Sequence, residues 1–226
     1  MSSGLASAQE RPSRVAWAPS DTGSCGECAL ADHDLSGWDI SGGDYSGANL
    51  TNANLYRLSA SETNLSGVIA IGANFIKARL DQADLEGANL SGATLDDASL
   101  IGGNLTRAGL ESAKLHDAVL IGATLTGANL RSVGADYADF SGANLTGANF
   151  EFAALKETYF NNSVLTGVSF ANADLSAAEI KDTRLINVDF SGCAGLDTIN
   201  FEGSCALNSI GLPTAITLPL CSELSD

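Results

Sequence analysis

The chain has a five-residue hydrophobic repeat that runs without a gap through most of its length. Every residue whose number is a multiple of five is apolar from Leu30 to Phe190; these thirty-three positions hold 21 Leu, 6 Phe, 2 Ile, 1 Tyr and 3 Ala. Two residues before each of them lies a second column, in which 19 of the thirty-three residues are Ala. A period of five matches neither the turn of an α-helix nor the simple alternation of a strand. The chain must therefore form a repetitive fold built from very short units.

Each pentad predicts a very short strand followed by a corner. Its two apolar positions are two residues apart, as in a strand whose alternate side chains face inward. The other three positions are rich in Asn, Asp, Ser, Thr and Gly, which suit turns and exposed surface. Corners close a coil, and stacked coils enclose a core. Phe150, Phe170 and Phe190 are twenty residues apart, as are Phe140 and Phe160, which indicates four pentads per coil because like residues stack well.

Several pentads resemble the A(D/N)LXX signature of the pentapeptide-repeat family, among them Ala48-Asn49-Leu50-Thr51-Asn52 and Ala143-Asn144-Leu145-Thr146-Gly147. The resemblance implies an all-β fold, a right-handed quadrilateral parallel β-helix of about eight coils at ~4.8 Å each. It divides the chain into an N-terminal tail or cap (1–27), a pentapeptide-repeat β-helix (28–192), and a shifted final coil with a C-terminal cap (193–226).

The repeat also predicts the core. Representative inward residues are Leu50, Leu90, Leu130, Phe150, Phe170 and Phe190. Three central positions hold Ala instead, and the residue two before each is then larger than usual: Leu58 before Ala60, Val68 before Ala70, and Val133 before Ala135. This exchange keeps the volume of each pair roughly constant, as close packing requires. All six of these residues are therefore expected to point inward.

Both ends of a β-helix need caps, because open ends expose strand edges and core side chains. Trp17 and Trp38 are expected to cover the first coil. At the other end Leu196, Phe201 and Ala206 continue the rhythm shifted by one, which predicts an insertion within 191–195. The segment 211–220 is expected to fold over the open end, as a cap or as the contact of a homodimer.

The five cysteines lie only near the ends of the repeat: Cys25, Cys28, Cys193, Cys205 and Cys221. In an oxidising compartment we expect a disulfide in each cap, and in a reducing one buried thiols; the odd count leaves one thiol free in either case. Cys25 and Cys28 with His33 would make an incomplete metal site unless Asp32 or Asp34 supplied a ligand. We therefore predict no metal.

The N-terminal sequence gives an indication of the cellular compartment in which the protein functions. Ala6-Ser7-Ala8 fits the A-x-A pattern of signal-peptide cleavage sites, although no apolar region precedes it in this sequence. Export to the periplasm is the expectation, and a cytoplasmic protein with a small-residue start is the alternative.

Composition excludes several functions. The formal net charge of −16 and pI near 4.2 disfavour direct binding of nucleic acid, and no apolar stretch is long enough to span a membrane. Catalytic residues and cofactors are not expected, since a rod presents flat faces and the chain has two histidines, His33 and His116. We predict a non-enzymatic scaffold that binds a protein partner of unknown identity.

Stacking in steps of twenty gathers five carboxylates on one face, and these form the candidate acidic interaction face: Asp96, Asp97, Asp117, Asp136 and Glu157. The resemblance implies an alternative function, because some pentapeptide-repeat proteins imitate DNA and protect DNA gyrase or topoisomerase IV from quinolones. An ordinary solvated face explains the same residues. A row of Thr106, Thr126, Thr146 and Thr166 fits exposed strand positions better than an ice-binding surface.

Overall fold

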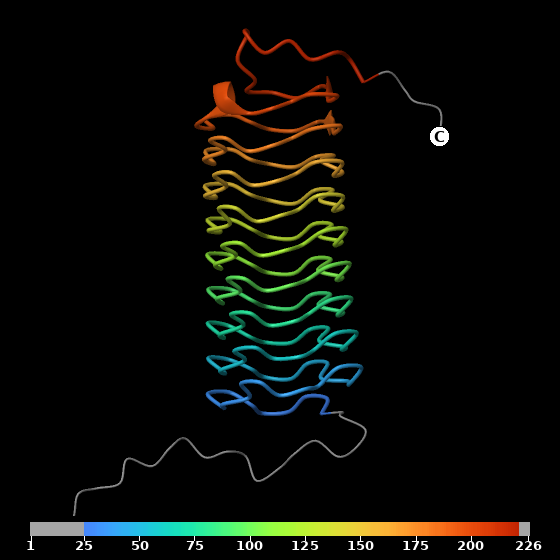
Figure 1. Ribbon diagram of the computed structural model, residues 1–226, viewed down its shortest axis with the longest axis vertical. Helices are drawn as coiled ribbons and strands as arrows, with labels where there is room; N and C mark the ends of the chain where they lie inside the picture. Colours follow the sequence, from blue (N-terminus) through green and yellow to red (C-terminus); the bar gives the residue numbers. More distant parts are fainter. Residues whose placement is uncertain (1–24, 222–226) are drawn as a thin grey trace, which may run out of the picture.

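The computed structural model describes residues 25–221 as one stack of coils that climbs from the N-terminal to the C-terminal end (Figure 1). Parallel bridges join residues twenty positions apart, for example Asn49 with Ile69 and Asn129 with Asn149. A coil therefore contains four pentads, as the spacing of the phenylalanines predicted. Within residues 25–221, no helix has the length and hydrophobicity needed to cross a membrane.

Each corner is a tight turn that begins at the central apolar residue. In the turn after Leu50, the Ala53 N–H donates to the Leu50 carbonyl at 2.9 Å, and Asn52 has a left-handed backbone with φ of 54°. A positive φ at the third residue is the pattern of a type II turn. The Asn49 side chain accepts a hydrogen bond from the Thr51 N–H at 3.0 Å. This explains why Asn or Asp so often precedes the central Leu, since its oxygen satisfies a corner N–H.

The coils are joined by backbone hydrogen bonds in both directions. Asn89 donates to Val68 in the preceding coil at 2.8 Å, while Leu90 donates to Gly109 in the following coil at 2.7 Å. The corner residue Gly92 adds a third bond, to Glu111 at 2.9 Å. The pattern repeats in nearly every pentad, so the short inward segments have their backbone groups paired.

The core is a continuous column of apolar side chains along the axis. The six representative residues, from Leu50 to Phe190, are at most 1% exposed. The Phe140 and Phe160 rings stack with centroids 5.3 Å apart, and Phe150 and Phe170 do the same at 5.3 Å. Phe140 and Phe150 meet edge to face at 5.7 Å, so the two stacks interlock. All six residues of the three exchanged pairs are buried as well.

Regular secondary structure in the described residues is confined to the C-terminal end: β1 (Arg184–Ile186), the 3₁₀ helix η1 (Leu196–Thr198) and β2 (Cys205–Leu207). The strands are parallel, with Arg184 opposite Cys205. The bridge between Asp174 and Ala194 joins residues twenty positions apart, whereas the next bridge, between Glu179 and Asn200, joins residues twenty-one positions apart. Gly195, with φ of 75°, lies at this change and leads into η1, and Leu196 returns to the core.

The last described segment crosses the end of the stack (Figure 1). Its side chains Leu212, Ile216 and Leu218 pack partly buried against the core. Ala206 donates to Pro219 at 2.9 Å, and Cys221 donates to Ala206 at 3.2 Å. The segment therefore caps the helix. At the opposite end Trp38 packs partly buried against the core, whereas Trp17 lies outside the described residues.

The exchanged pairs generate a test of packing. Ala135→Leu should lower the free energy of unfolding by about 1–3 kcal/mol, because a buried site receives extra volume. Adding Val133→Ala should recover part of that loss. Urea denaturation measures both changes. Ala154→Leu is the matched control, since Ala154 is exposed and its replacement should change stability little. A double variant no more stable than Ala135→Leu alone would contradict the volume exchange.

Candidate functional site

The outward residues fall into four columns, because the same pentad recurs in every coil. We name each column by one residue and define it by its central positions. The central positions of the Asp97 column are 35, 55 and every twentieth residue up to 175, and those of the Ile101 column run in the same steps from 40 to 180. Those of the Thr106 column run from 45 to 185, and those of the Ile71 column from 30 to 190. A coil passes through them in that order.

All five carboxylates of the candidate acidic face lie in the Asp97 column. They occupy two rows that also carry other residues. One row runs Lys77, Asp97, Asp117, Tyr137 and Glu157 in consecutive coils; the other runs Asp96, His116, Asp136 and Lys156. Among the carboxylates of these rows, only Asp97 and Asp117 are direct neighbours.

Cations pair with most of these carboxylates. Lys77 Nζ lies 3.9 Å from Asp97, and Lys156 Nζ lies 3.9 Å from Glu157. His116 Nε2 lies 3.8 Å from Asp136, an ion pair when the imidazole is protonated. Such exposed pairs each contribute about 0–1 kcal/mol. Their effect on the surface is larger, because basic side chains interrupt the carboxylates of both rows.

Corner hydrogen bonds keep several carboxylates of the rod ionised. The Ser41 hydroxyl and N–H lower the pKa of Asp39, and the Ser176 hydroxyl and N–H lower that of Asp174. Since the folded-state pKa is the lower one, this stabilisation is present above the unfolded-state pKa and is lost as the pH falls through the folded-state value. At acidic pH the surface therefore loses negative charge, and the corners lose the stabilisation that these hydrogen bonds give.

Two of the four threonines in the row of the Thr106 column have hydroxyls that are hydrogen-bonded within their own coils. The hydroxyls of Thr106 and Thr146 each donate to the preceding Asn side chain, Asn104 and Asn144, at 2.7 Å. These hydroxyls serve the corners, which supports their interpretation as structural residues.

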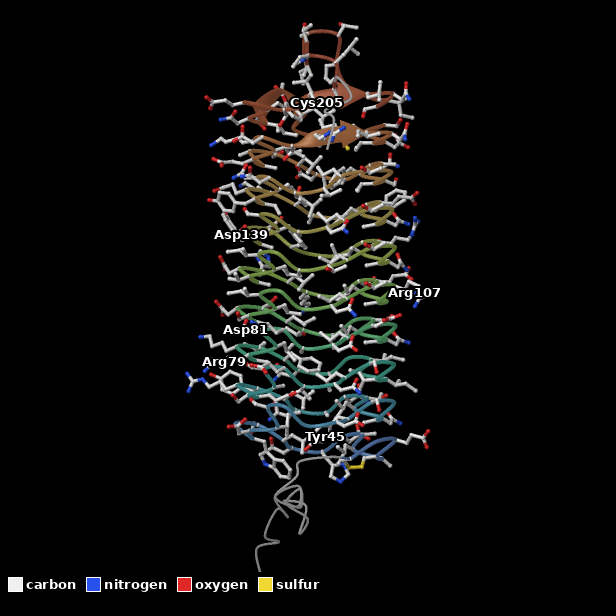
Figure 2. All side chains as sticks on the ribbon, turned by 90° about the vertical axis from the view of Figure 1, so that its right-hand side faces the viewer. Tyr45, Arg79, Asp81, Arg107, Asp139 and Cys205 are labelled. Carbon is white, nitrogen blue, oxygen red and sulfur yellow. A yellow bond between two sulfur atoms is a disulfide. The ribbon has the colours of Figure 1, made fainter. Side chains whose placement is uncertain are left out.

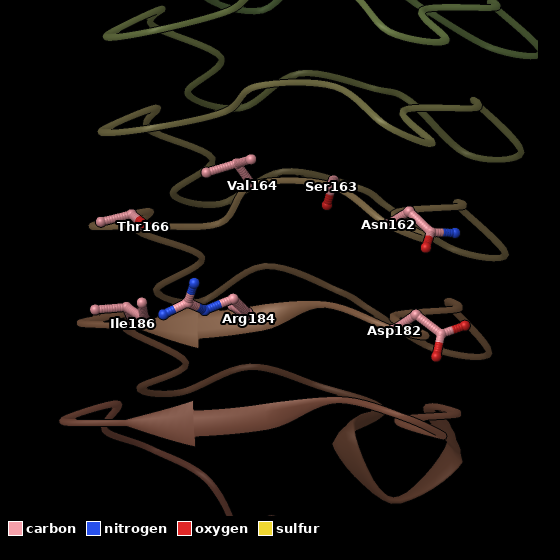
Figure 3. A pocket seen from close by; sticks show the side chains of 7 residues that line it. All are labelled: Asn162, Ser163, Val164, Thr166, Asp182, Arg184 and Ile186. Carbon is pink, nitrogen blue, oxygen red and sulfur yellow. The ribbon is translucent and has the colours of Figure 1, made fainter. Parts of the chain in front are cut away.

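An open groove of about 320 Å³ lies between two successive coils near the C-terminal end (Figure 3). Its lining consists of Asn162, Ser163, Val164, Thr166, Asp182, Arg184 and Ile186. The Ser163 hydroxyl donates to the Phe160 carbonyl at 2.7 Å, and neither histidine lines the groove.

The cysteines form one disulfide near each end of the helix, Cys25–Cys28 and Cys205–Cys221, with Cα atoms 5.5 and 4.9 Å apart. Cys193 is the leftover thiol that the odd count predicted. Its sulfur donates to the Phe170 carbonyl at 2.9 Å, and burial raises its pKa to about 11. His33 hydrogen-bonds to the Ala31 carbonyl at 2.7 Å.

Sequence reasoning missed a set of exposed isoleucines. Ile69 and Ile71 are 43% and 41% exposed, and Ile101 and Ile121 are also 43% and 41% exposed. The signal was available, because these residues occupy outward positions where the repeat normally has Ser, Thr, Asn or Asp. At the C-terminal end Leu220 is 79% exposed and belongs to the segment 211–220, the alternative role of which is the contact of a homodimer.

Comparisons with known proteins agree with this architecture. A family model described as pentapeptide repeats (8 copies) matches the chain in overlapping segments from residue 34 to residue 192. HetL, a pentapeptide repeat protein involved in heterocyst differentiation regulation in Nostoc sp. strain PCC 7120, is 27% identical over 81% of this chain and 86% of its own, with a TM-score of 0.50. No curated protein sequence matches the chain.

Two further solved structures are less similar. QnrB1, a plasmid-mediated fluoroquinolone resistance protein, is 19% identical over 80% of this chain and 90% of its own, with a TM-score of 0.42. A pentapeptide repeat protein of the Arabidopsis thaliana thylakoid lumen is 21% identical over 70% and 73% of the two chains, with a TM-score of 0.19.

The disulfides predict a thiol count. Unfolded, unreduced protein should react with Ellman's reagent at one thiol per chain, and reduced protein at all five cysteines. Protein purified without reductant from its native host is the decisive sample. Five reactive thiols in that sample would show that the pairs do not form there.

Burial of Cys193 predicts slow alkylation in the folded protein. Because only the thiolate reacts, a pKa of about 11 leaves about 0.1% of the sulfur reactive at pH 8. Iodoacetamide should therefore modify the native chain at least about a hundredfold more slowly than the chain in urea, and the native rate should rise tenfold per pH unit up to about pH 11. Equal rates in the two states would mean that the thiol is exposed.

Proposed function

Because this chain belongs to the pentapeptide-repeat family, we propose that it is a rigid, non-enzymatic scaffold that binds another protein through its outer columns. The right-handed, four-sided course and the count of about eight coils implied by the repeat are part of this proposal.

The observation that carries the proposal is the uninterrupted ladder between coils over a filled core. Bridges in steps of twenty run from Ala29–Asn49 to Asp174–Ala194 without a loop. Outward side chains are therefore held on a backbone that has few alternative conformations. A preformed surface loses little conformational entropy when a partner binds, which favours recognition by a rigid face.

The similarity to HetL supports a role in binding rather than in catalysis, since HetL is involved in regulation. The open groove beside Arg184 supports the same view. Ser163 is the buried hydroxyl side chain in its lining, and this hydroxyl already donates a hydrogen bond to the backbone. The flat sides of a rod suit contact with a protein surface better than they suit the enclosure of a small molecule.

The DNA-mimic alternative is less well supported. Duplex DNA presents closely spaced phosphates of one sign. In the Asp97 column, Lys77, His116 and Lys156 stand among the carboxylates, and Tyr137 separates Asp117 from Glu157. The net charge of −16 still favours a cationic partner, but not through a continuous array on this face.

We further propose that the protein works in an oxidising compartment, as expected after export. A disulfide near each end of the helix supports this location, because such bonds persist mainly outside the reducing cytosol. A cytoplasmic location would fit the gyrase alternative better.

Site-specific photo-crosslinking in the native host tests the scaffold function. A benzophenone amino acid should replace one outward residue in each column: Asp97, Ile101, Thr126 and Glu111. We expect one or two adjacent columns to form an adduct with the same protein, and the remaining columns serve as internal controls. Mass spectrometry identifies the adduct, and a gyrase or topoisomerase IV subunit would support the alternative function.

No adduct from any column, or equal adduct yields from all four columns, would contradict a scaffold that binds a specific protein.

A further inference from the structure

The Ile101 column carries an apolar patch near the middle of the rod. Ile101 and Ile121 are exposed by 43% and 41%, and Val119 lies beside them half-buried. The Gly102 N–H donates to the Ile121 carbonyl at 2.9 Å, so the two isoleucines belong to consecutive coils and stack along the rod. Three aliphatic side chains thus form one patch on a rigid backbone.

The next row leaves open space beside this patch. Gly102, Gly122 and Gly142 follow one another there in consecutive coils. A Cβ atom placed on Gly122 would meet nothing within 4 Å. A partner could therefore bring its own side chains or backbone close to Ile121 without meeting side chains from this row, whereas beside Ile101 the Gln82 side chain of the same row lies 3.7 Å from a Cβ atom placed on Gly102.

Carboxylates border the patch at both ends. Asp81 accepts a hydrogen bond from the Ile101 N–H at 3.2 Å, and Asp139 pairs with Val119 in the bridge ladder. Figure 2 shows Asp81 and Asp139 on the same side of the rod. Among the described residues, neither of them forms an ion pair within 4.0 Å.

The whole column carries a net negative charge. Its acidic residues are Asp39, Glu62, Asp81, Asp139, Glu179 and Asp182, with Glu202 beyond the insertion. Its cations are Arg79, which lies on the N-terminal side of the patch, and Lys181, which pairs with Glu179 at 2.9 Å. A cationic ligand is therefore attracted along the column as well as at the patch.

From this arrangement we infer that Ile101, Val119 and Ile121, between Asp81 and Asp139, form a docking surface for a cationic amphipathic segment of a partner protein. Apolar side chains of that segment cover the isoleucines, and its Lys or Arg residues reach the two carboxylates. The inference rests on the proposed scaffold function and names the chemistry of its partner.

The Ile71 column supplies an internal comparison. Ile69 and Ile71 have the same exposure as Ile101 and Ile121. The side chains in the coils on either side of them are uncharged: Asn49, Thr51, Asn52, Asn89 and Ser91. Charge complementarity therefore favours the Ile101 column over Ile69 and Ile71, which are two equally exposed isoleucines.

A peptide-binding measurement tests the docking surface. The probe is a fluorescent amphipathic peptide of leucine and lysine, about 18 residues long, and binding to the full chain is followed by anisotropy. Ile101→Ser with Ile121→Ser should weaken binding by about tenfold, through lost apolar contact. Asp81→Asn with Asp139→Asn should weaken it by about threefold and reduce its salt dependence.

Three controls separate docking from general attraction to an acidic protein. Ile69→Ser with Ile71→Ser should leave the affinity unchanged. A leucine–lysine peptide of the same composition in scrambled order should bind at least about tenfold more weakly, and a leucine–glutamate peptide should not bind. Denaturation midpoints of all variants should match the parent, because every substituted side chain faces outward.

Equal effects of the two isoleucine pairs, or equal affinity for the ordered and scrambled peptides, would overturn the docking surface. The scaffold function is judged separately by crosslinking. An adduct that forms from other columns but not from Ile101 would leave the scaffold standing and remove this surface, whereas no adduct anywhere would remove the scaffold itself.

Discussion

The hydrogen-bond ladder between successive coils is the interaction on which the rest of this structure depends. Asn89 donates to Val68 in the preceding coil and Leu90 donates to Gly109 in the following coil. These bonds place each residue on the residue twenty positions earlier, as Asn89 lies on Ile69. Inward residues therefore become a continuous core, and outward residues become rows at a spacing of about 4.8 Å. The outward neighbours of a residue therefore include the residues of its row in the coils above and below.

The corners make this ladder compatible with five-residue units. A left-handed residue is needed two positions after each central residue, and the chain places Gly there in many pentads and larger residues such as Arg57 and Phe152 in others. A non-glycine residue in this conformation costs about 1 kcal/mol or more. The preceding Asn or Asp side chain offsets part of that cost by accepting the corner N–H, as Asn49 does from Thr51.

The ends show what happens where the ladder stops. Beyond Ala194 one extra residue shifts the register, and the segment that ends at Cys221 pairs with Ala206 and covers the last coil. The Cys205–Cys221 disulfide holds that segment in place. The covered C-terminal end leaves the sides of the rod as the available surface of the described residues, and for this reason the function is sought in the columns.

The sequence by itself determined the coil, the core and the position of the register shift. A strict period of five requires short units, and phenylalanines twenty residues apart indicate four units per turn, because like residues stack well. Only the tertiary structure decided which charges neutralise one another, which cysteines pair and which apolar residues stay exposed. Lys77 meets Asp97, Cys205 meets Cys221, and Ile101 lies under Ile121 because coils and cap bring together residues that are distant in sequence. A repeat specifies where a side chain points, whereas its partners depend on the side chains that the neighbouring coils present.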